Sequence, residues 1–492
     1  MPDPSADTPK RPRQHVFQPP RGTRDFYPAE MLRRRWIEEQ WRRTATRHGF
    51  EEIDGPRFEH ADLYTVKSGE GILSELFSFK RAGGKTSFAL RPEFTPTLAR
   101  MIAARANSLP KPTKWFSVGP YFRAERPQRG RLREFLQWNV DILGAAEDDE
   151  ETRAQQDAET IACCVEMLRR AGLTPEMVRI KTSDRRLLEE QLRLFGVSND
   201  LLPKWFQMLD RVPLADRKQV KDAANIIGMD EPTAERVREA ILEQQQFGFA
   251  GSQQRLMEKR RAGPHLTTDH ESFVEAAREL TEPYFKAFYA WSRHRRETLS
   301  YLCDFGIDDW VDFDFSIVRG LAYYTGMVFE VHEITGKERA IAGGGRYDNL
   351  VSLFGGPPTP AVGFAMGDVV LAHVLQDKGL MPSDAELRDR LGLRPDVFVI
   401  STGTDESEAA LPGVVAGLRH AGMHARHTYK TTRNLGKLLK EAASVGARFA
   451  AILEVAQTCA LKDLDSGAQT DGVPIAALAE RVKAARAEAD RS

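Results

Sequence analysis

Cysteine is scarce in this chain, with only four among 492 residues. Cys163 and Cys164 are adjacent in an apolar helical stretch, and neither Cys303 nor Cys459 has neighbours at the spacing of a zinc site. This scarcity excludes a disulfide framework and gives no metal-ligating cluster. We therefore interpret the four cysteines as buried, reduced thiols.

Long apolar runs are also missing, since no stretch approaches the roughly 20 residues of a membrane span. Residues 1–21 combine prolines and charges and have no apolar centre, so they do not match a secretory signal. Asp3 and Asp7 argue against a mitochondrial transit peptide, because such peptides contain few acidic residues. We expect a disordered arm over 1–21 and a cytoplasmic protein without membrane association.

Charge of one sign is not in excess, because 70 lysines and arginines face 71 aspartates and glutamates for a net charge of -1. This balance excludes a surface that acts as a polycation over its whole area, but it permits local basic patches. The length is enough for about three domains with substantial cores.

The sequence pattern changes three times along the chain. From Gly22 to Gly144, short β-like runs alternate with helical ones, and Pro28 suits the first turn of a helix that ends near Gly49. Residues 152–309 are polar and helix-forming, and β-like runs return at 310–315 and 327–332.

A linker at Gly392–Pro395 separates this part from a C-terminal region in which β-like and helical runs alternate. This alternation predicts a small α/β domain.

The segment YFRAERPQRGRLREFLQW, residues 121–138, interleaves arginines and glutamates with aromatic residues. Alternation predicts a strand with Arg123 and Glu125 on one face, followed by a cationic loop that contains Gly130. A guanidinium on a rigid strand can bind a carboxylate or phosphate with two hydrogen bonds, and Phe135 could offer its ring to a base. The alternative interpretation is a solvated, charged hairpin.

Two further segments contain residues typical of binding sites. In IVRGLAYYTGMVFE, residues 317–330, Arg319 and the pair Tyr323–Tyr324 could orient a small polar molecule, or the tyrosines could be core aromatics. Residues 340–367 contain the cluster Gly343–Gly345, which permits close approach of a ligand to the backbone or forms a flexible turn. The spacing matches neither a dinucleotide-binding motif nor a P-loop.

Read in order, these segments resemble the class II histidyl-tRNA synthetases. GTRDFYP and GFEEIDGPRFE are similar to motif 1 of that family, and LRPEFTPTLARM with FRAERPQRGRLREFLQWNVDILG to its amino-acid loop and motif 2. VRGLAYYTG resembles the histidine-specific motif of the family. AGGGRYDNLV resembles the second histidine motif, and TPAVGFAMG resembles motif 3. ALKDLDSGAQ resembles part of the anticodon-binding domain.

The resemblance implies an α+β fold, with a class II antiparallel-sheet catalytic core, a helical insertion and a C-terminal α/β anticodon-binding domain. The implied core covers residues 22–175 and 305–385, the insertion 176–304 and the C-terminal domain 394–492.

The resemblance also implies a histidine–tRNA ligase with L-histidine, ATP accompanied by Mg²⁺ and tRNA(His) as substrates, acting as a homodimer without a resident metal. Arg123 and Arg319 would be the catalytic residues, neutralising the α-phosphate from opposite sides. Glu125 would accept the adenine amine, Phe135 would stack on the ring, and Arg131 would reach the terminal phosphates.

The same resemblance assigns the histidine-binding residues. The α-ammonium group would be received by Glu93, Thr95 and Gln137. Asp141 and Tyr324 would bracket the imidazole, with Tyr323 and Tyr347 lining the pocket. A carboxylate on one ring nitrogen and a phenol on the other would fix its tautomer. The best candidates for contact with tRNA are the loop arginines Arg126, Arg129, Arg131 and Arg133.

One departure from the family concerns motif 3, where Val370 stands at the position of an arginine that usually clamps the γ-phosphate. Either other cations such as Arg131 or Arg346 hold the triphosphate, or ATP binds differently. Ala322 also stands where the family usually has aspartate. The alternative function is a non-catalytic synthetase-like paralogue that binds histidine or tRNA as a regulatory subunit.

Overall fold

The structure is a computed structural model. It describes residues 17–68, 75–145, 149–194, 196–209, 212, 216–239, 242, 290–291, 293–314, 317, 323–430 and 434–489. The chain separates into two compact units, one of residues 1–25 with 37–381 and one of residues 26–36 with 382–492. Among the described helices, none is long and apolar enough to cross a membrane.

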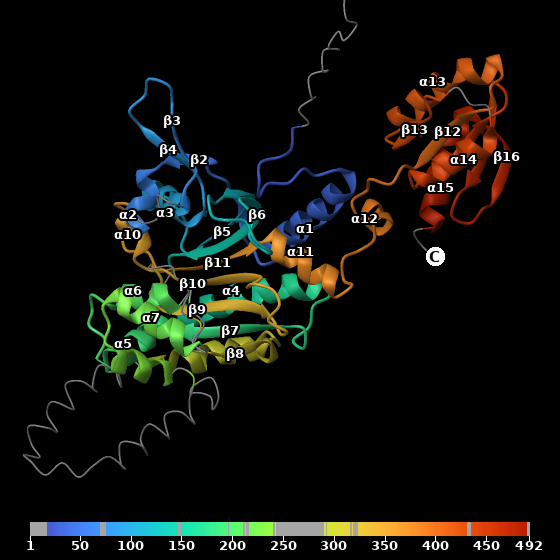
Figure 1. The fold of residues 1–492 in the computed structure, drawn as a ribbon. Coiled ribbons are helices and arrows are strands. Elements are labelled where there is room, and N and C mark those ends of the chain that lie inside the picture. Colours follow the sequence, from blue (N-terminus) through green and yellow to red (C-terminus); the bar gives the residue numbers. More distant parts are fainter. Residues whose placement is uncertain are drawn as a thin grey trace, which may run out of the picture. The chain divides into compact units, whose positions relative to one another are not determined.

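The first unit is built on an eight-stranded sheet in the order β1-β5-β6-β11-β10-β9-β7-β8 (Figure 1). Its strands are β1 (Glu51–Glu52), β5 (Thr113–Phe122), β6 (Glu134–Leu143), β7 (Val178–Asp184), β8 (Val311–Phe313), β9 (Met327–Glu333), β10 (Ala342–Arg346) and β11 (Ala361–Gly367). The central pairs are antiparallel, and the parallel pairs, β1 with β5 and β7 with β8, lie at the two edges. This is the α+β, antiparallel-sheet core that the sequence predicts.

Side chains alternate along β6 and give the two faces of this sheet different roles. Trp138 points to the face covered by helices, where it stacks on Trp41 at 6.2 Å between ring centroids. The helices on this face are α1 (Pro28–Arg47), α4 (Glu150–Arg170) and α11 (Asp368–Asp377). The other face carries the candidate site.

A smaller sheet, β2-β4-β3, lies beside this core and consists of Phe58–His60, Ser87–Leu90 and Ser78–Lys80 in that order. The helices that follow or precede these strands are α2 (Asp62–Ser68) and α3 (Thr95–Arg105). Leu98 and Ile102 of α3 pack in one core with Leu350 of α10 (Leu350–Leu353). This core closes the candidate-site face on one side.

The described helical segment after β7 consists of α5 (Arg185–Leu194), α6 (Leu202–Leu209) and α7 (Arg217–Ile227). Its own hydrophobic core includes Trp205 and Phe206. The expected insertion boundary at residue 176 is too early, because Val178–Asp184 pairs with both β8 and β9 in the large sheet. Alternating burial along β7 makes it a sheet strand, and helices begin only at Arg185.

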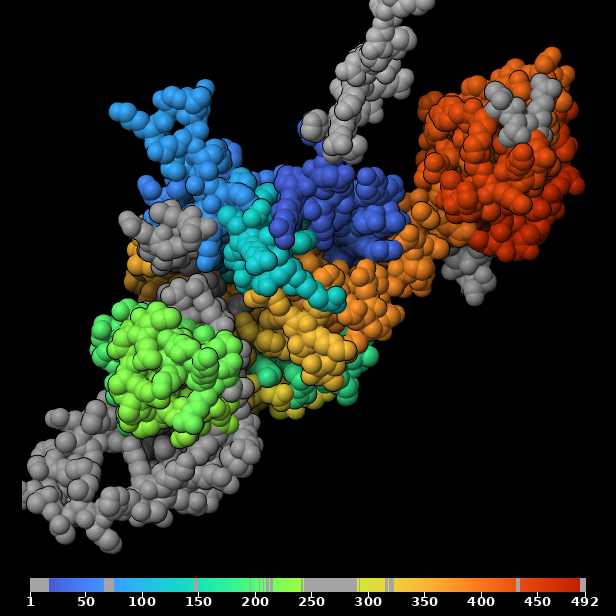
Figure 2. Space-filling view, viewed as in Figure 1, coloured from blue at the N-terminus to red at the C-terminus, as the bar shows by residue number. Residues whose placement is uncertain are grey.

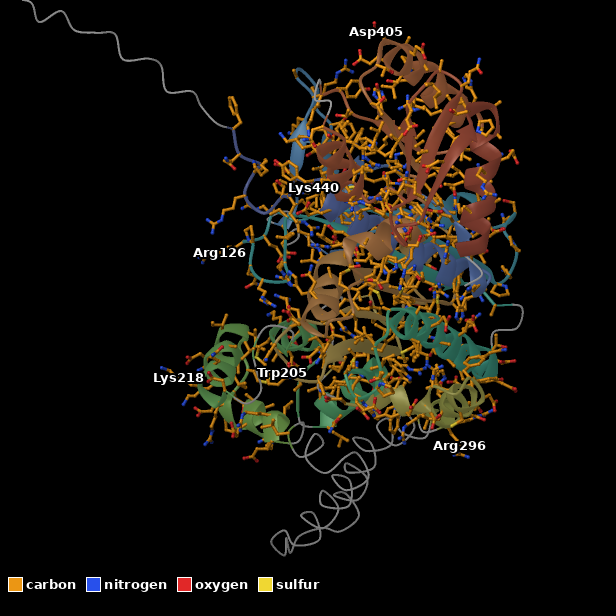
Figure 3. The ribbon with its side chains drawn as sticks, turned by 90° about the vertical axis from the view of Figure 1, so that its right-hand side faces the viewer. Arg126, Trp205, Lys218, Arg296, Asp405 and Lys440 are labelled. Atoms are coloured by element: carbon orange, nitrogen blue, oxygen red, sulfur yellow. The ribbon has the colours of Figure 1, made fainter. Side chains whose placement is uncertain are left out.

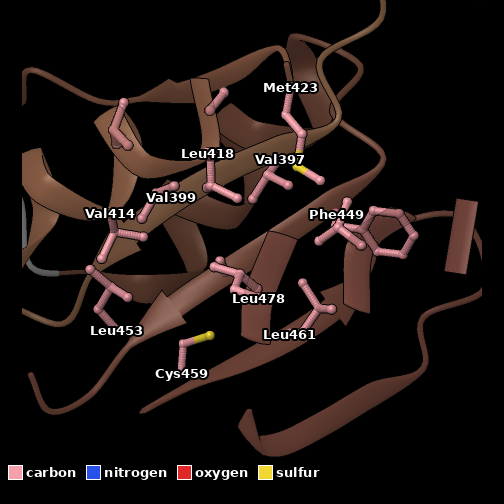
Figure 4. Packing of buried hydrophobic residues seen from close by; sticks show 14 of the residues in the cluster. Val397, Val399, Val414, Leu418, Met423, Phe449, Leu453, Cys459, Leu461 and Leu478 are labelled. Atoms are coloured by element: carbon pink, nitrogen blue, oxygen red, sulfur yellow. The ribbon is translucent and has the colours of Figure 1, made fainter. Parts of the chain in front are cut away.

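The second unit contains α12 (Asp384–Arg390) and a five-stranded sheet in the order β13-β12-β14-β15-β16. The strands are β12 (Val397–Ser401), β13 (Ala425–His427), β14 (Phe449–Leu453), β15 (Thr458–Asp463) and β16 (Gln469–Pro474). The helices α13 (Asp405–His420) and α15 (Ile475–Ala489) pack on one face, where Leu418 and Leu478 meet Val397 (Figure 4). Leu438 of α14 (Leu435–Ser444) packs on the other face, so the unit is α/β as predicted.

Three local expectations need correction. Gly343–Gly345 is not a turn but part of the buried strand β10. Arg123 and Glu125 do not continue the strand, because β5 ends at Phe122 and the amide of Ala124 turns away to donate to the carbonyl of Glu75. Cys303 is exposed, whereas Cys163, Cys164 and Cys459 are buried.

Candidate active site

Strand β6 places three expected site residues and the neighbouring Asn139 on one face of the large sheet. Phe135, Gln137, Asn139 and Asp141 alternate with residues that point toward the helices. The amide nitrogen of Asn139 donates to the hydroxyl of Tyr121 at 3.1 Å, which fixes the neighbouring strand β5 to this row. The row spans both the expected nucleotide region and the expected amino-acid region.

Asp141 and three tyrosines form the carboxylate–tyrosine cluster, which consists of Asp141, Tyr323, Tyr324 and Tyr347. The Tyr347 hydroxyl donates to Oδ1 of Asp141 at 2.5 Å. The Tyr323 ring lies 4.8 Å from that of Tyr324 and 5.8 Å from that of Tyr347, measured between centroids. The structure thus brings together the four residues expected to surround the imidazole.

Burial gives this cluster unusual protonation behaviour. Burial raises the pKa of Asp141 to about 7, and the hydrogen bond from Tyr347 opposes that rise only in part. The pKa of Tyr347 is raised well above its ordinary value, by burial and then by the neighbouring Asp141 charge. A polar ligand that donates an N–H to Asp141 would stabilise the carboxylate that burial disfavours.

Two glycines form the floor beneath these side chains. Gly345 of β10 and Gly363 of β11 are direct partners in the antiparallel ladder. A Cβ on Gly363 would lie 2.0 Å from Oδ1 of Asp141, and one on Gly345 would lie 2.9 Å from the Tyr324 ring. Only glycine at both positions leaves room for Asp141 and Tyr324, so these two side chains are the groups that approach the glycine backbone closely.

The second group is the arginine–glutamate cluster, which consists of Arg123, Glu125, Arg131 and Phe135. The guanidinium of Arg123 lies 5.0 Å from the centre of the Phe135 ring, and its Nε donates to the carbonyl of Pro92 at 3.2 Å. Burial lowers the pKa of Arg123, with Glu93 and Glu125 opposing the shift. A desolvated cation of this kind favours an anionic ligand.

Arg131 forms an ion pair with Glu125 across the loop that joins β5 to β6. The side chain of Arg133 donates from Nε to the backbone carbonyl of Glu125 at 3.1 Å. Two expected nucleotide-binding side chains are therefore paired with each other. Glu125 can accept a hydrogen bond from the amine of a base, and Arg131 can bind a phosphate.

The three residues expected to receive an α-ammonium group come from different elements. Glu93 precedes α3, Thr95 is its first residue, and Gln137 lies on β6 between Phe135 and Asp141. Among the described side chains, Oε1 of Gln137 is one of the buried oxygens without a hydrogen-bond partner. Such an acceptor fits a ligand that donates N–H groups.

Other expectations have different outcomes. Arg319 and Ala322 lie outside the described residues. Arg346 is buried, and its Nη2 contacts Oδ1 of Asp157 at 2.5 Å, so it is not placed to clamp a γ-phosphate. Val370 is buried on α11. Among the described residues, no group of His, Cys, Asp and Glu is arranged to hold a metal ion.

Sequence reasoning missed Arg91, whose side chain is fully buried. Its Nη1 donates to Oδ1 of Asp54 at 2.7 Å, and its guanidinium lies 4.6 Å from the centre of the Tyr121 ring. Through these contacts Arg91 joins the segment before α3 to β5. An arginine at the end of the apolar run Ser87–Leu90 was the available signal, because a charge there must be paired when buried.

Comparison with known sequences matches this chain to a family over most of its length. A family model described as histidyl-tRNA synthetase matches residues 22–368. The histidine–tRNA ligase of Opitutus terrae is 37% identical over 460 residues, covering 93% of this chain and 96% of the relative. The chloroplastic/mitochondrial histidine–tRNA ligase of Arabidopsis thaliana is 34% identical, with coverages of 87% and 79%.

Solved structures share the fold. The histidyl-tRNA synthetase of a Nostoc species gives a TM-score of 0.67 at 22% identity, covering 95% of this chain and 99% of that one. The apo enzyme of S. aureus gives 0.65 at 23% identity, with coverages of 95% and 100%. With the sequence relatives and the family match, these findings show that the chain belongs to the histidyl-tRNA synthetase family.

Proposed function

We propose that this protein joins L-histidine to the 3'-terminal adenosine of tRNA(His) in two steps, through a histidyl-adenylate. The observation that carries the proposal is the row of side chains on one face of β6. Phe135 lies under Arg123 at one end, Asp141 bonds Tyr347 at the other, and Gln137 between them has a buried amide oxygen without a partner. This order suits a nucleotide, an amino group and an imidazole in sequence.

In the first step, a carboxylate oxygen of histidine attacks the α-phosphorus of ATP, and the bond to the bridging oxygen of pyrophosphate breaks. Negative charge develops on the phosphoryl oxygens, so positioned cations lower the barrier and no protein nucleophile is needed. Arg123 is our candidate for this role, since it is desolvated and held by the Pro92 carbonyl. Arg319 is the proposed second cation.

ATP binding would exchange partners within the arginine–glutamate cluster. The adenine amine would donate to Glu125, the base would stack on Phe135, and Arg131 would leave Glu125 for the terminal phosphates. Mg²⁺ would arrive with these phosphates as part of the substrate. In this exchange Glu125 would accept a hydrogen bond from a neutral amine in place of the Arg131 cation, and the charge of Arg131 would be used on the phosphates.

Recognition of histidine would rest on the carboxylate–tyrosine cluster. Asp141 accepts one imidazole N–H, and the hydroxyl of Tyr324 meets the other ring nitrogen, with Tyr323 and Tyr347 beside the ring. Glu93, Thr95 and Gln137 receive the α-ammonium group. An analogue without ring nitrogens would leave Asp141 unpaired in a buried site, which supports discrimination against it.

In the second step, a ribose hydroxyl of the tRNA attacks the adenylate carbonyl and AMP leaves. We propose that the C-terminal α/β unit binds the anticodon, that the protein acts as a homodimer, and that it works in the cytoplasm.

The regulatory alternative has less support. The curated relatives named above are ligases, and the alignments cover 96% and 79% of their own lengths. A Bacillus halodurans structure titled as an ATP phosphoribosyltransferase regulatory subunit/histidyl-tRNA synthetase has a TM-score of 0.60 at 19% identity, a likeness of fold alone. Arg123, Glu125 and Asp141, on which the catalytic proposal relies, are all present in this chain.

The test is histidine-dependent exchange of labelled pyrophosphate into ATP by the full chain. We expect exchange by the wild type and a loss of about a hundredfold or more in Arg123→Ala, since one electrostatic contact to the transition state is removed. The control is Arg217→Ala, which removes an exposed arginine paired with Glu235 on the helical segment. Absence of exchange in pure wild type would favour the regulatory alternative.

A further inference from the structure

The loop between β5 and β6, residues 123–133, has a defined tip. Gln128 and Arg131 exchange two backbone hydrogen bonds, of 3.0 and 2.9 Å. Gly130 lies between them with φ of +72°, a conformation that favours glycine. The tip is thus a tight turn with a defined backbone, and this backbone sets where the side chains of Gln128, Arg129 and Arg131 begin.

One of these side chains ties the tip to a distant part of the sheet. Nε of Arg129 donates to Oε1 of Glu338 at 2.6 Å, and its Nη2 lies 3.3 Å from Oδ2 of Asp377. Glu338 belongs to the connection between β9 and β10, and its side chain is only 3% exposed. A carboxylate so well removed from water requires a cation, and Arg129 meets that requirement.

The tip also rests on the residue that replaces the family's motif 3 arginine. A Cβ on Gly130 would lie 3.2 Å from Cγ2 of Val370 and 3.7 Å from Oε2 of Glu338. In the space-filling view, the cyan part of the chain borders its gold and orange parts (Figure 2). The apolar side chain of Val370 therefore packs against the turn.

We propose that Arg129 and Glu338 are positioning residues that latch the 123–133 loop onto Val370 and so present Glu125 and Arg131 to ATP. This inference rests on the proposed function. It also gives the departure at position 370 a physical reason. An arginine there would place another cation beside Glu338, where it would compete with Arg129 and weaken the latch.

The first test compares Arg129→Ala and Glu338→Gln in the pyrophosphate-exchange assay. We expect each to raise the KM for ATP roughly three- to tenfold, the range of one partly exposed, charge-assisted contact, with the KM for histidine within twofold. The double variant should be no worse than the poorer single one, because both changes remove the same contact. Additive effects, or unchanged KM for ATP in both, would overturn the latch.

The second test is Val370→Arg, which separates the latch from a simple loss of a phosphate-binding cation. The latch predicts a higher KM for ATP, whereas a missing cation predicts a lower one. Arg217→Ala, which removes another largely exposed arginine that is ion-paired away from the loop, is the control and should match the wild type.

A third measurement is independent of catalysis. Amide hydrogen exchange across residues 126–133 of the ligand-free protein should be faster in Arg129→Ala and Glu338→Gln than in Arg217→Ala, at equal unfolding temperature. Equal exchange in all three variants refutes the latch. If amide exchange is faster in Arg129→Ala and Glu338→Gln but the wild type has no pyrophosphate-exchange activity, the latch is retained, whereas the proposed function and the link to ATP are rejected.

Discussion

At the scale of single residues, the amino-acid end of the site depends on two glycines, which have no Cβ atom. Gly345 and Gly363 face each other in the β10–β11 ladder, and their hydrogens are the floor below Tyr324 and Asp141. A methyl group on either would occupy the space of those site groups. The glycines thus act on recognition through packing.

We therefore expect Gly363→Ala to lower the free energy of unfolding by about 1–3 kcal/mol, the usual cost of overpacking, and to raise the KM for histidine more than that for ATP. The measurements are thermal unfolding and exchange kinetics. Gly367→Ala on the same strand is the control for stability, since a Cβ there meets nothing within 4 Å. Equal unfolding temperatures for the two variants would contradict this account.

The identities of the site residues were more predictable than their contacts. The resemblance to the family named both Gln137 and Asp141, and strand periodicity along β6 explains why they share a face. The pairing of Arg346 with Asp157 was not predictable, since it joins a strand to a helix 189 residues earlier in the chain. Neither was the burial of Arg91, which depends on the tertiary contact with Asp54.

At the scale of elements, a buried ionic network joins α4, β10 and the helical residues 293–304. Asp157 of α4 contacts Arg346 of β10 at 2.5 Å and Nε2 of His294 at 2.8 Å, and Nδ1 of His294 lies 2.7 Å from Glu150. Burial opposes protonation of His294, but the two carboxylates outweigh it and raise its pKa to about 9. The network therefore holds a charged histidine at neutral pH.

This network predicts a pH dependence of stability. Because the pKa of His294 is about 9 in the folded state and near 6.5 when unfolded, its contribution is complete below about pH 6.5 and is lost as the pH rises through 9. The loss is of the order of 2 kcal/mol between pH 7 and 9.5. Urea unfolding of the wild type and His294→Gln at several pH values measures it.

Comparing the wild type with His294→Gln isolates His294 from the thiols of Cys163 and Cys164. Burial raises the pKa of both thiols, so they stay protonated in the folded protein in this range but begin to ionise in the unfolded chain. Asp141, with its pKa raised to about 7, acts mainly below this window. A stability difference between wild type and variant that does not change with pH would contradict the role of His294.

Element boundaries show where sequence patterns reach their limit. The C-terminal unit contains the mixture of strands and helices that the alternating runs after Gly392–Pro395 predict, because each run is locally continuous. The segment Gly343–Gly345 reads as a turn from its composition alone. It is a strand because β9 and β11 pair with both of its edges, which no local pattern contains.

At the scale of the whole molecule, a net charge of -1 gives no overall attraction for the tRNA phosphates, so local cations must provide it. Three of the four loop arginines already have partners, since Arg129 pairs with Glu338, Arg131 with Glu125, and Arg133 donates to a backbone carbonyl. Arg126 is exposed and projects from the loop in Figure 3. Within the described part of the chain, it has no ion pair or hydrogen bond.

We predict that Arg126 contributes one phosphate contact to tRNA. In Arg126→Ala, kcat/KM for tRNA in charging should fall, and the plot of its logarithm against the logarithm of salt concentration should flatten by about one unit of slope. Arg43→Ala is the control, because Arg43 is equally a surface cation but already pairs with Glu39 on α1. An unchanged slope in Arg126→Ala would contradict the prediction and show that other basic surfaces of the protein contact the tRNA phosphates.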